Sequence, residues 1–308
     1  MDKPFRTHGE LIKLLHSRGL STDRHTKFIL EREGYYSVVN GYKDLFLDEE
    51  KSKKHGHECY KKDAEFSEIY ALFVMDRHLR TSLFRYITLA EATLKSISIY
   101  EFCSQNREDN EAYLKHDSYR NEKRYSVLID RFIKELNRII GRSEKSPKYN
   151  KDYLEHYIKN HDNVPLWVVM NNLSLGQAFK FYDFQNESIR FHIAQRFQKL
   201  YNETHYGKKR ITHKDIYNAY NNIKEFRNIC AHDERVFCAR VGKSKSVSFS
   251  NVLDNLQIVL TDIQYKTLVH EILNNLVEAS SSIHTIGLFD ILPLMGFESL
   301  NDLASVEK

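Results

Sequence analysis

The sequence predicts an all-α protein, on the basis of its composition and the spacing of its apolar residues. The chain of 308 residues contains only 11 glycines and 4 prolines, too few for the many tight turns of a sandwich or barrel. Hydrophobic residues make up 41% of the chain and charged residues 29%, as in a folded globular protein rather than a disordered one. Most apolar residues recur with the period of a helix.

The first half of the chain contains four segments with helical spacing of apolar residues. They cover residues 11–15, 22–33, 65–102 and 119–140. Glycines suited to a helix C-terminus follow three of these segments, namely Gly19, Gly34 and Gly141. The polar and basic stretch from Asp48 to Asp63 is typical of a surface loop.

In the second half, Pro165 begins an apolar segment in which Ser174 or Gly176 interrupts a pair of buried helices. A helix at residues 187–200 follows. Thr212 is suited to cap the N-terminus of the next helix. The apolar stripe of that helix consists of Ile216, Ala219, Tyr220, Ile223, Phe226 and Cys230. Two or three further helices complete the chain.

The charge and the cysteines exclude several classes of protein. A net charge of +4 is too mild to indicate nucleic-acid binding by itself. The four cysteines lack a CxxC pair, which argues against a zinc site and indicates reduced thiols. The N-terminal residues lack the apolar segment of a signal peptide, and no apolar run reaches the length of a membrane span. We therefore expect a cytoplasmic protein without membrane contact, metal or cofactor.

Polar side chains interrupt the apolar pattern in the segment EFRNICAHDERVF, residues 225–237. At about 100° per residue, Arg227 lies inside the apolar arc centred on Ile223, whereas Asn228 and His232 fall on the opposite side. Asn228 and His232 are i,i+4 neighbours and can interact directly. Arg227 approaches His232 only if the helix ends or bends between them, or if the residues of two subunits converge across a two-fold axis.

These residue types suit metal-free cleavage of RNA. That reaction needs a base for the 2′-OH proton, an acid for the leaving 5′-oxygen and a cation for the phosphorane. A symmetric dimer would supply two histidines and two arginines. The spacing alone is a weak signal, because about one match is expected by chance in a chain with this many arginines and histidines. A surface arginine and a histidine at a helix C-terminus are the ordinary alternative.

Other residues could support such a site. On the helix at 65–102, Asp76, Arg77 and Arg80 would form either a polar cluster near the site or a surface ion pair. Glu91 is a candidate partner for Arg227, because a buried arginine needs one. Two basic segments flank the motif helix and would either follow a phosphate backbone or form solvated loops. Their candidate RNA-binding residues are Lys208, Lys209, Arg210, Arg235, Arg240, Lys243 and Lys245.

Tyr35, Tyr36 and Tyr42 have two interpretations, base stacking or packing of an N-terminal subdomain. The sequence contains no glycine-rich phosphate loop, no HExxH and no GxSxG. Their absence argues against nucleotide hydrolysis, zinc proteolysis and serine hydrolysis.

The segment RNICAHDERVF resembles the Rx4-6H motif of HEPN-type ribonucleases, including the polar residue directly after the arginine. More closely, the chain resembles the abortive-infection proteins of the AbiD/AbiF group. This resemblance covers most of the chain in five segments that occur in the same order. They are KPFRTHGELIKLLHSRGL, GYYSVVNGYKDLF, FSEIYALFVMDRHLR, VPLWVVMNNLSLGQAFKFY and FRNICAHDERVF.

The resemblance implies a HEPN-like helical bundle with additional N- and C-terminal helices. We therefore predict one Abi-like domain over residues 1–308, with an N-terminal helical subdomain at 1–47 and a HEPN-like core at 65–282. The resemblance also implies a homodimer in bacterial anti-phage defence, which cuts RNA without metal to leave a 2′,3′-cyclic phosphate. A structured non-coding RNA that restrains the nuclease, as in a toxin–antitoxin pair, is an expected partner.

Carried over to this sequence, the motif assigns a role to each of three residues. Arg227 would bind and polarise the phosphate, Asn228 would orient the site, and His232 would act as acid or base. The rival interpretation is a non-catalytic RNA-binding or scaffold protein, in which Arg227 contacts phosphates without cleavage. In a second rival interpretation, the protein is itself the substrate of a nucleotide-transferring partner, and the motif helix is the face on which that partner docks.

Overall fold

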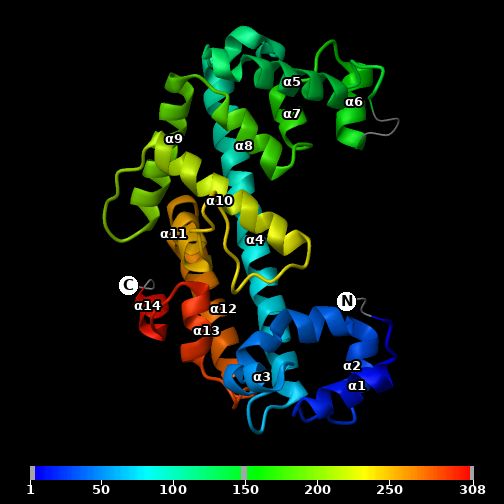
Figure 1. Ribbon diagram of the computed structural model, residues 1–308. Helices are drawn as coiled ribbons and strands as arrows, with labels where there is room; N and C mark the ends of the chain where they lie inside the picture. Colours follow the sequence, from blue (N-terminus) through cyan, green and yellow to red (C-terminus); the bar gives the residue numbers. More distant parts are fainter. Residues whose placement is uncertain (1–3, 147–150, 306–308) are drawn as a thin grey trace. The chain divides into compact units, whose positions relative to one another are not determined.

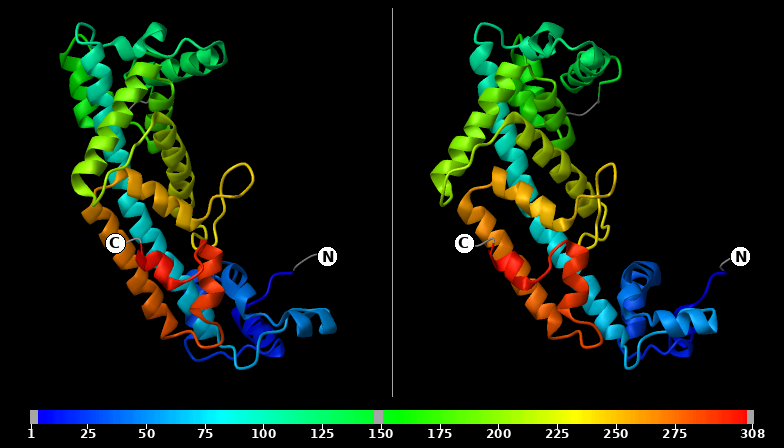
Figure 2. Two further views of the ribbon diagram at one scale, coloured as in Figure 1. Left: turned by 90° about the vertical axis from the view of Figure 1, so that its left-hand side faces the viewer. Right: turned by 60° about the vertical axis from the view of Figure 1, so that its left-hand side comes forward.

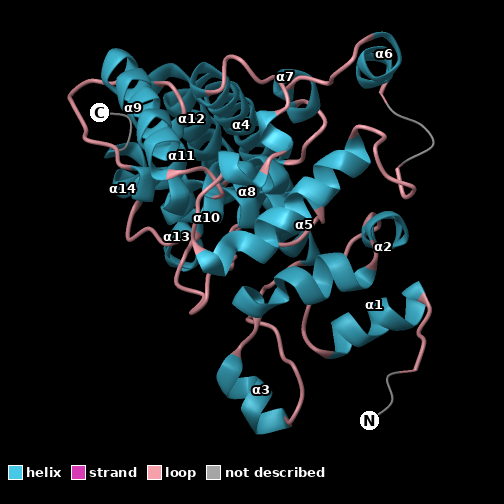
Figure 3. Cartoon of the chain, turned by 90° about the horizontal axis from the view of Figure 1, so that it is seen from above, coloured by secondary structure: helices cyan, strands magenta, loops and turns pink. Residues whose placement is uncertain are grey.

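The computed structural model describes residues 4–146 and 151–305. Within these residues the structure consists of helices and connecting loops, without a strand (Figure 3). The prediction of an all-α fold is confirmed. Figure 1 labels the α-helices. The helices are α1 (His8–Ser17), α2 (Thr26–Glu33), η1 (Tyr36–Asn40), η2 (Lys43–Phe46), α3 (Glu49–His55), α4 (Phe66–Gln105), η3 (Ala112–Leu114), η4 (His116–Ser118), α5 (Lys123–Ile139), α6 (Asp152–Asn160), α7 (Leu166–Met170), α8 (Leu175–Asp183), α9 (Glu187–Thr204), α10 (His213–Ala231), α11 (Phe249–Val259), α12 (Asp262–Ser280), α13 (Leu288–Met295) and α14 (Leu300–Ser305).

The chain forms two compact units, each assembled from segments that are distant in the sequence. Unit 1 comprises Met1–Phe84, Asn228–Asn251 and Lys266–Lys308, and unit 2 comprises Arg85–Arg227 and Val252–Tyr265. The helices α4, α10, α11 and α12 contribute residues to both units. Because the division falls inside helices, no linker marks it in the sequence.

In unit 1, helix α12 lies beside the first half of α4 (Figure 2). The side-chain amide of Asn275 on α12 donates to the carbonyl oxygen of Met75 over 2.8 Å. Near the start of α4, the buried carboxylate of Glu68 accepts hydrogen bonds from the N–H groups of His284 (2.7 Å) and Thr285 (2.6 Å). The chain that follows α12 is therefore tied to the first turn of α4.

In unit 2, the second half of α4 packs against α9 and α10. Arg196 of α9 forms an ion pair with the buried Glu101 of α4 over 2.6 Å. The fully buried Tyr220 of α10 donates its hydroxyl to the carbonyl oxygen of Ala90 over 2.7 Å. The Tyr220 contact joins α10 to α4. The stripe residues Ile216, Ala219, Tyr220, Ile223 and Phe226 are buried, as their spacing predicts.

Several predicted helix ends are confirmed, because their signals are local. Gly19 and Gly34 follow α1 and α2 with φ of 89° and 83°, a conformation that glycine adopts without steric cost. Thr212 caps α10: its hydroxyl accepts the N–H of Asp215 over 3.3 Å, and the Asp215 carboxylate accepts the N–H of Thr212 over 2.8 Å. Ser174 caps α8 in the same way, so the helix pair is interrupted there.

Two predictions were wrong in part. The stretch from Asp48 to Asp63 was expected to be a loop, but it contains α3 (Glu49–His55). Asp48 accepts the N–H of Lys51 over 3.0 Å, and the helix has acidic residues in its first turn and basic residues in its last. These charges favour the helix through its dipole, although it has no apolar stripe to reveal it. Helix α2 also begins later than expected, at Thr26.

Two glycines at helix ends, Gly296 after α13 and Gly56 after α3, differ in the space available for a Cβ. Gly296 has φ of 94°, and a Cβ there would lie 2.5 Å from the hydroxyl oxygens of both Ser248 and Ser250. Gly56 has φ of 70° with nothing within 4 Å of the added carbon. We expect Gly56→Ala to lower the free energy of unfolding by about 1 kcal/mol, and Gly296→Ala to lower it by about 3 kcal/mol because of the added clash. Chemical denaturation of both variants measures the difference, and equal losses would contradict it.

Glu68 predicts a pH dependence of stability. Burial raises the pKa of its carboxyl, but the hydrogen bonds from Thr285, His284 and Glu65 outweigh burial and leave the pKa below its ordinary value. A lowered folded-state pKa means that the ionised group stabilises the fold above its unfolded pKa, and that this contribution is lost as the pH falls through the folded pKa. We therefore expect Glu68→Gln to be less stable than wild type at pH 7. The difference between their free energies of unfolding should shrink below about pH 4.5, and a constant difference down to pH 3 would refute this.

Candidate functional site

Helix α10 ends in a turn that places His232 at its C-cap. The N–H of His232 donates to the carbonyl oxygen of Asn228 over 3.0 Å, and the N–H of Glu234 donates to the carbonyl oxygen of Ile229 over 3.1 Å. Asp233, between them, has φ of 56°. This is the pattern of a Schellman turn, with Asp233 at the left-handed position that glycine usually occupies. The side chain of His232 is exposed, and the helix ends where one of the two predicted geometries requires.

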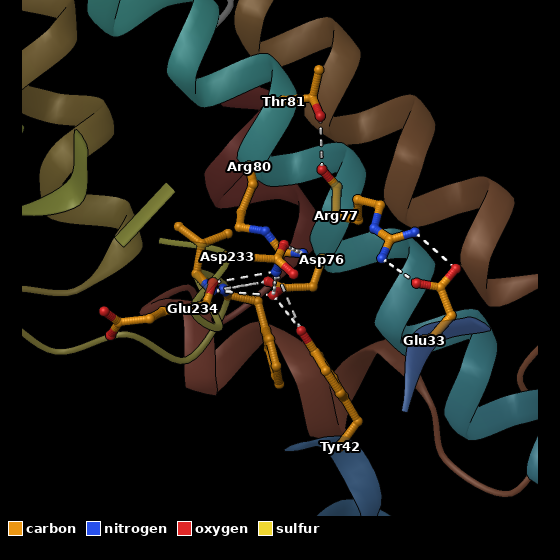
Figure 4. A network of polar contacts seen from close by, with 10 residues as sticks. Glu33, Tyr42, Asp76, Arg77, Arg80, Thr81, Asp233 and Glu234 are labelled. Atoms are coloured by element: carbon orange, nitrogen blue, oxygen red, sulfur yellow. Dashed lines mark hydrogen bonds and ion pairs between the residues drawn. The ribbon is translucent and has the colours of Figure 1, made fainter. Parts of the chain in front are cut away.

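The chain after this turn is held by a buried carboxylate of α4 (Figure 4). Asp76 is fully buried and accepts the N–H groups of Val236 (3.1 Å) and Phe237 (2.7 Å). It also accepts the hydroxyl of Tyr42 and the guanidinium of Arg80, each over 2.7 Å. Four donors therefore converge on one carboxylate, and two of them are backbone groups just beyond the helix end.

Arg80 connects the same carboxylate to the turn itself. One guanidinium nitrogen donates to Asp76, and also to the carbonyl oxygen of Glu234 over 3.2 Å. The other forms an ion pair with Asp233 over 2.5 Å. Arg80 is buried, so its charge is compensated by two carboxylates and a carbonyl rather than by water. The residue that follows His232 is thus fixed to α4.

We call Tyr42, Asp76, Arg80 and Asp233 the Asp76 cluster. For Tyr42, Asp76 and Arg80, burial is the strongest influence on the pKa. Burial raises the pKa of Asp76, whereas its hydrogen bonds and the Arg80 charge oppose that shift. Burial and the neighbouring Asp76 raise the pKa of the Tyr42 hydroxyl. The Tyr42 hydroxyl therefore keeps its proton and donates a hydrogen bond to Asp76. All the neighbours of Asp76 are donors, which suits the carboxylate form.

Unit 1 contains a cavity of about 570 Å³ whose walls come from the N-terminal segment, α4 and the chain after α10. Of the four RNA-binding candidates that follow the motif helix, Arg235, Arg240 and Lys245 line this cavity. Lys243 lies on the same exposed turn as Lys245 but does not line it.

Unit 2 contains a separate cavity of about 650 Å³ beside α9 and the start of α10. The three candidates that precede the motif helix, Lys208, Lys209 and Arg210, line it together with His213. Lys208 donates to the carbonyl oxygen of Asn202 over 2.7 Å. The seven predicted RNA-binding residues thus belong to two places in the structure, and six of them line a cavity.

The remaining candidates are placed as follows. Arg227 is half-buried in the part of α10 that belongs to unit 2. Glu91, its predicted partner, forms an ion pair with Lys95 over 2.7 Å, one turn further along α4. Arg77 turns toward Glu33 and forms two hydrogen bonds with it, of 3.2 and 2.7 Å (Figure 4). Of the three charged candidates on the first half of α4, Asp76 and Arg80 form hydrogen bonds with the motif segment, and Arg77 forms its hydrogen bonds with Glu33.

Tyr42 and Asp233 also belong to the Asp76 cluster, although the sequence did not identify them as its members. A signal for Asp233 was present, because Asp76 and Arg80 fall on the buried face of α4 and buried charges need partners. The charged residues just after His232 were available as partners. Tyr42 carried no comparable signal, since its hydroxyl could equally have reached solvent.

Comparison with known proteins identifies the family. Residues 28–238, more than half of the chain, match the family model described as Abi-like protein. The chain therefore belongs to the Abi-like protein family, and this membership suggests a role in abortive infection, a bacterial defence against phage. The matched range contains both the Asp76 cluster and the end of α10. No curated protein and no solved structure matches the chain.

Three further findings describe the surroundings of the site. All four cysteines carry free thiols. Residues 4–146 and 151–305 include no helix with the length and apolar character needed to cross a membrane. In the same part of the chain, no three His, Cys, Asp or Glu side chains are grouped so that they could hold a metal ion.

The Asp76 cluster predicts a large difference between two neighbouring substitutions on α4. Asp76→Ala leaves the buried Arg80 with one carboxylate fewer and the Val236 and Phe237 N–H groups without their acceptor. We expect it to lower the free energy of unfolding by about 3–5 kcal/mol. Arg77→Ala removes a partly exposed ion pair, and we expect a loss of about 1 kcal/mol or less. Urea denaturation of the two variants provides the measurement; a similar loss in both would show that the cluster does not anchor the chain.

Proposed function

We propose that the protein is a metal-independent endoribonuclease of phage defence, in which Arg227 and His232 carry the reaction. The observation that supports this most strongly is the setting of His232. Its imidazole is exposed at the end of α10, while the next residue, Asp233, is fixed to the buried Arg80. A proton-transferring side chain needs solvent access and a defined position, and here the imidazole is exposed while its backbone lies next to an anchored residue.

In the proposed reaction, the 2′-oxygen of a ribose attacks the adjacent phosphorus and the bond to the 5′-oxygen breaks. The products are a 2′,3′-cyclic phosphate and a 5′-hydroxyl. One imidazole takes the 2′-OH proton and another gives a proton to the leaving 5′-oxygen. Because one chain offers a single motif histidine, His232, we propose that a homodimer supplies both. Arg227 neutralises the charge of the phosphorane and Asn228 orients the site.

The distribution of basic residues supports RNA as the substrate. Arg235, Arg240 and Lys245 line a cavity in unit 1, and the chain between Asp233 and Arg235 forms part of its wall. The phosphate backbone of RNA is attracted by such cations without regard to sequence. Lining residues of this cavity, Ile229 and Asp233, lie on both sides of His232 in the chain.

The same cations also support the alternative, a protein that holds a structured non-coding RNA without cutting it. Both cavities lined by predicted RNA-binding residues offer positive charge without the help of His232. In a nuclease, such an RNA would act as a restraint on cleavage.

The test is cleavage of a mixed RNA pool in EDTA by wild type, His232→Ala and Arg227→Ala, with the 3′ ends examined for cyclic phosphate. We expect His232→Ala to lose at least about 100-fold in rate, the lower end of general acid–base catalysis, with RNA affinity unchanged. Arg227→Ala should lose activity and some affinity. If the protein only binds RNA, none of the three forms should cleave it. Arg227→Ala should then bind RNA more weakly, and His232→Ala should bind it like wild type.

Two matched controls separate the motif from general effects. His55 is an exposed histidine of α3 in unit 1, and Arg138 is an exposed arginine of α5 in unit 2. We expect His55→Ala and Arg138→Ala to cleave like wild type. Cleavage that survives His232→Ala, or that His55→Ala reduces equally, would rule out the proposed site.

A further inference from the structure

The cavity of unit 1 combines fixed positive charges with an exposed aromatic ring. From this combination we infer that it binds a single nucleotide, with the phosphate held by Arg235, Arg240 and Lys245 and the base stacked on Tyr36. The nucleotide could be a residue of bound RNA, and in that case the inference rests on the proposed function and deepens it. The other source of the same chemistry is a free nucleotide. The cavity, at about 570 Å³, lies within the range of roughly 300–1,000 Å³ typical of small-ligand sites.

The two arginines are held in place without being neutralised. Arg235 donates to the carbonyl oxygen of Gly41 over 2.6 Å, and Arg240 donates to the carbonyl oxygen of Leu294 over 2.6 Å. Among the residues that the structure describes, neither arginine forms an ion pair with a carboxylate. Arg240 also donates to the carbonyl oxygens of Ala239 over 3.1 Å and Pro293 over 3.4 Å. A guanidinium has five N–H donors, so these backbone contacts orient each group and still leave donors on each for an anion.

Lys245 reaches the cavity because of an unusual turn. Val241 and Val247 exchange backbone hydrogen bonds of 3.0 and 3.2 Å, and the residues between them reverse the chain. Within this turn Gly242 has φ of 83° and Lys245 has φ of 50°, the second a conformation that is costly for a residue with a Cβ. The turn brings Lys245 into the lining of the cavity and leaves Lys243 outside it.

The positive charges of the cavity exceed its negative ones. The two carboxylates in the lining are those of Asp233 and Glu234. Asp233 is already paired with the buried Arg80, and the Glu234 side chain points away from the Asp76 cluster (Figure 4). Burial raises the pKa of the Cys238 thiol, and the charges of Arg235 and Arg240 both oppose that rise. Their charges therefore act on the same part of the cavity wall.

Tyr36 supplies the group that distinguishes a nucleotide from a simple anion. It begins the five-residue π-helix η1, a type of helix that is often found at functional sites. Its side chain is 81% exposed although it lines the cavity. An aromatic face beside phosphate-binding cations is the arrangement that binds single-stranded nucleic acid through base stacking. The other tyrosine of the lining, Tyr42, is buried in the Asp76 cluster and cannot stack.

Equilibrium binding tests the inference on the full-length protein carrying His232→Ala, which leaves an RNA probe intact. The probes are the four nucleoside 5′-monophosphates, adenosine and an unstructured RNA hexanucleotide. We expect Tyr36→Leu and Lys245→Gln each to weaken nucleotide binding about tenfold, because one loses a stacked ring and the other a phosphate contact. Tyr36→Phe retains the ring and should bind like its parent. Adenosine, which lacks the phosphate, should bind at least about tenfold more weakly than adenosine monophosphate.

The controls come from the same turn and from a tyrosine elsewhere. Lys243→Gln removes a neighbouring lysine that does not line the cavity, and Tyr206→Leu removes a tyrosine that is 96% exposed in unit 2. Neither should change the affinity for a nucleoside monophosphate, because neither residue lines the cavity. If Lys243→Gln and Lys245→Gln weaken nucleotide binding equally, the effect comes from general surface charge, and the inference is overturned. The absence of binding by every probe would also overturn it.

The two possible sources give different results. Tighter binding of a monophosphate than of the hexanucleotide identifies a free nucleotide, and the reverse identifies a residue of RNA. Failure of this inference also differs from failure of the proposed function. A wild type that cleaves RNA while Tyr36→Leu and Lys245→Gln bind nucleotides normally refutes the pocket alone. A wild type that cleaves nothing while both variants lose nucleotide binding refutes the nuclease alone.

Discussion

The buried carboxylate of Asp76 is the interaction on which the arrangement of unit 1 depends. Its donors come from three parts of the chain: Arg80 on the same helix, Tyr42 from the N-terminal segment, and the backbone of Val236 and Phe237 after α10. A buried charge that loses a partner costs far more free energy than an exposed one. None of the three segments can therefore move away without leaving that carboxylate poorly compensated, and this constraint couples the motif segment to α4.

The same constraint shapes the cavity in unit 1. Tyr42 stacks on Phe237 with ring centroids 6.0 Å apart and planes inclined by 19°, so the residues that bond Asp76 also pack against each other. Gly41, adjacent to Tyr42, accepts the guanidinium of Arg235. Gly41 and Arg235, which both line the cavity, are thus direct neighbours in the chain of Tyr42 and Val236, which Asp76 holds. A ligand would meet groups already in place, and less of its binding free energy would be lost in ordering them.

The features that could be predicted from sequence depend on neighbours along the chain. Local spacing predicts the apolar stripe of α10, and local signals predict its N-cap at Thr212 and the glycine after α1, Gly19. They do not predict the Asp76 cluster, because Asp76 and Val236 are 160 positions apart. The ion pair of Glu91 with Lys95 is of the local kind, because Lys95 lies one turn away on the same helix and needs no tertiary contact to reach it. Helix α3 was missed because its charges, not an apolar face, favour it.

The residue at position 233 shows which requirement dominates at the end of α10. A left-handed residue at a helix end is usually glycine, and a residue with a Cβ costs about 1–2 kcal/mol more there. Asp233 nevertheless occupies the position, and its carboxylate accepts the second nitrogen of the buried Arg80. Glycine would relieve the backbone but remove one of the two carboxylates that balance that guanidinium. Because the loss of one partner of a buried charge costs more than the backbone strain, charge compensation outweighs local conformation in this turn. The turn after His232 is therefore built as an anchor rather than as a hinge.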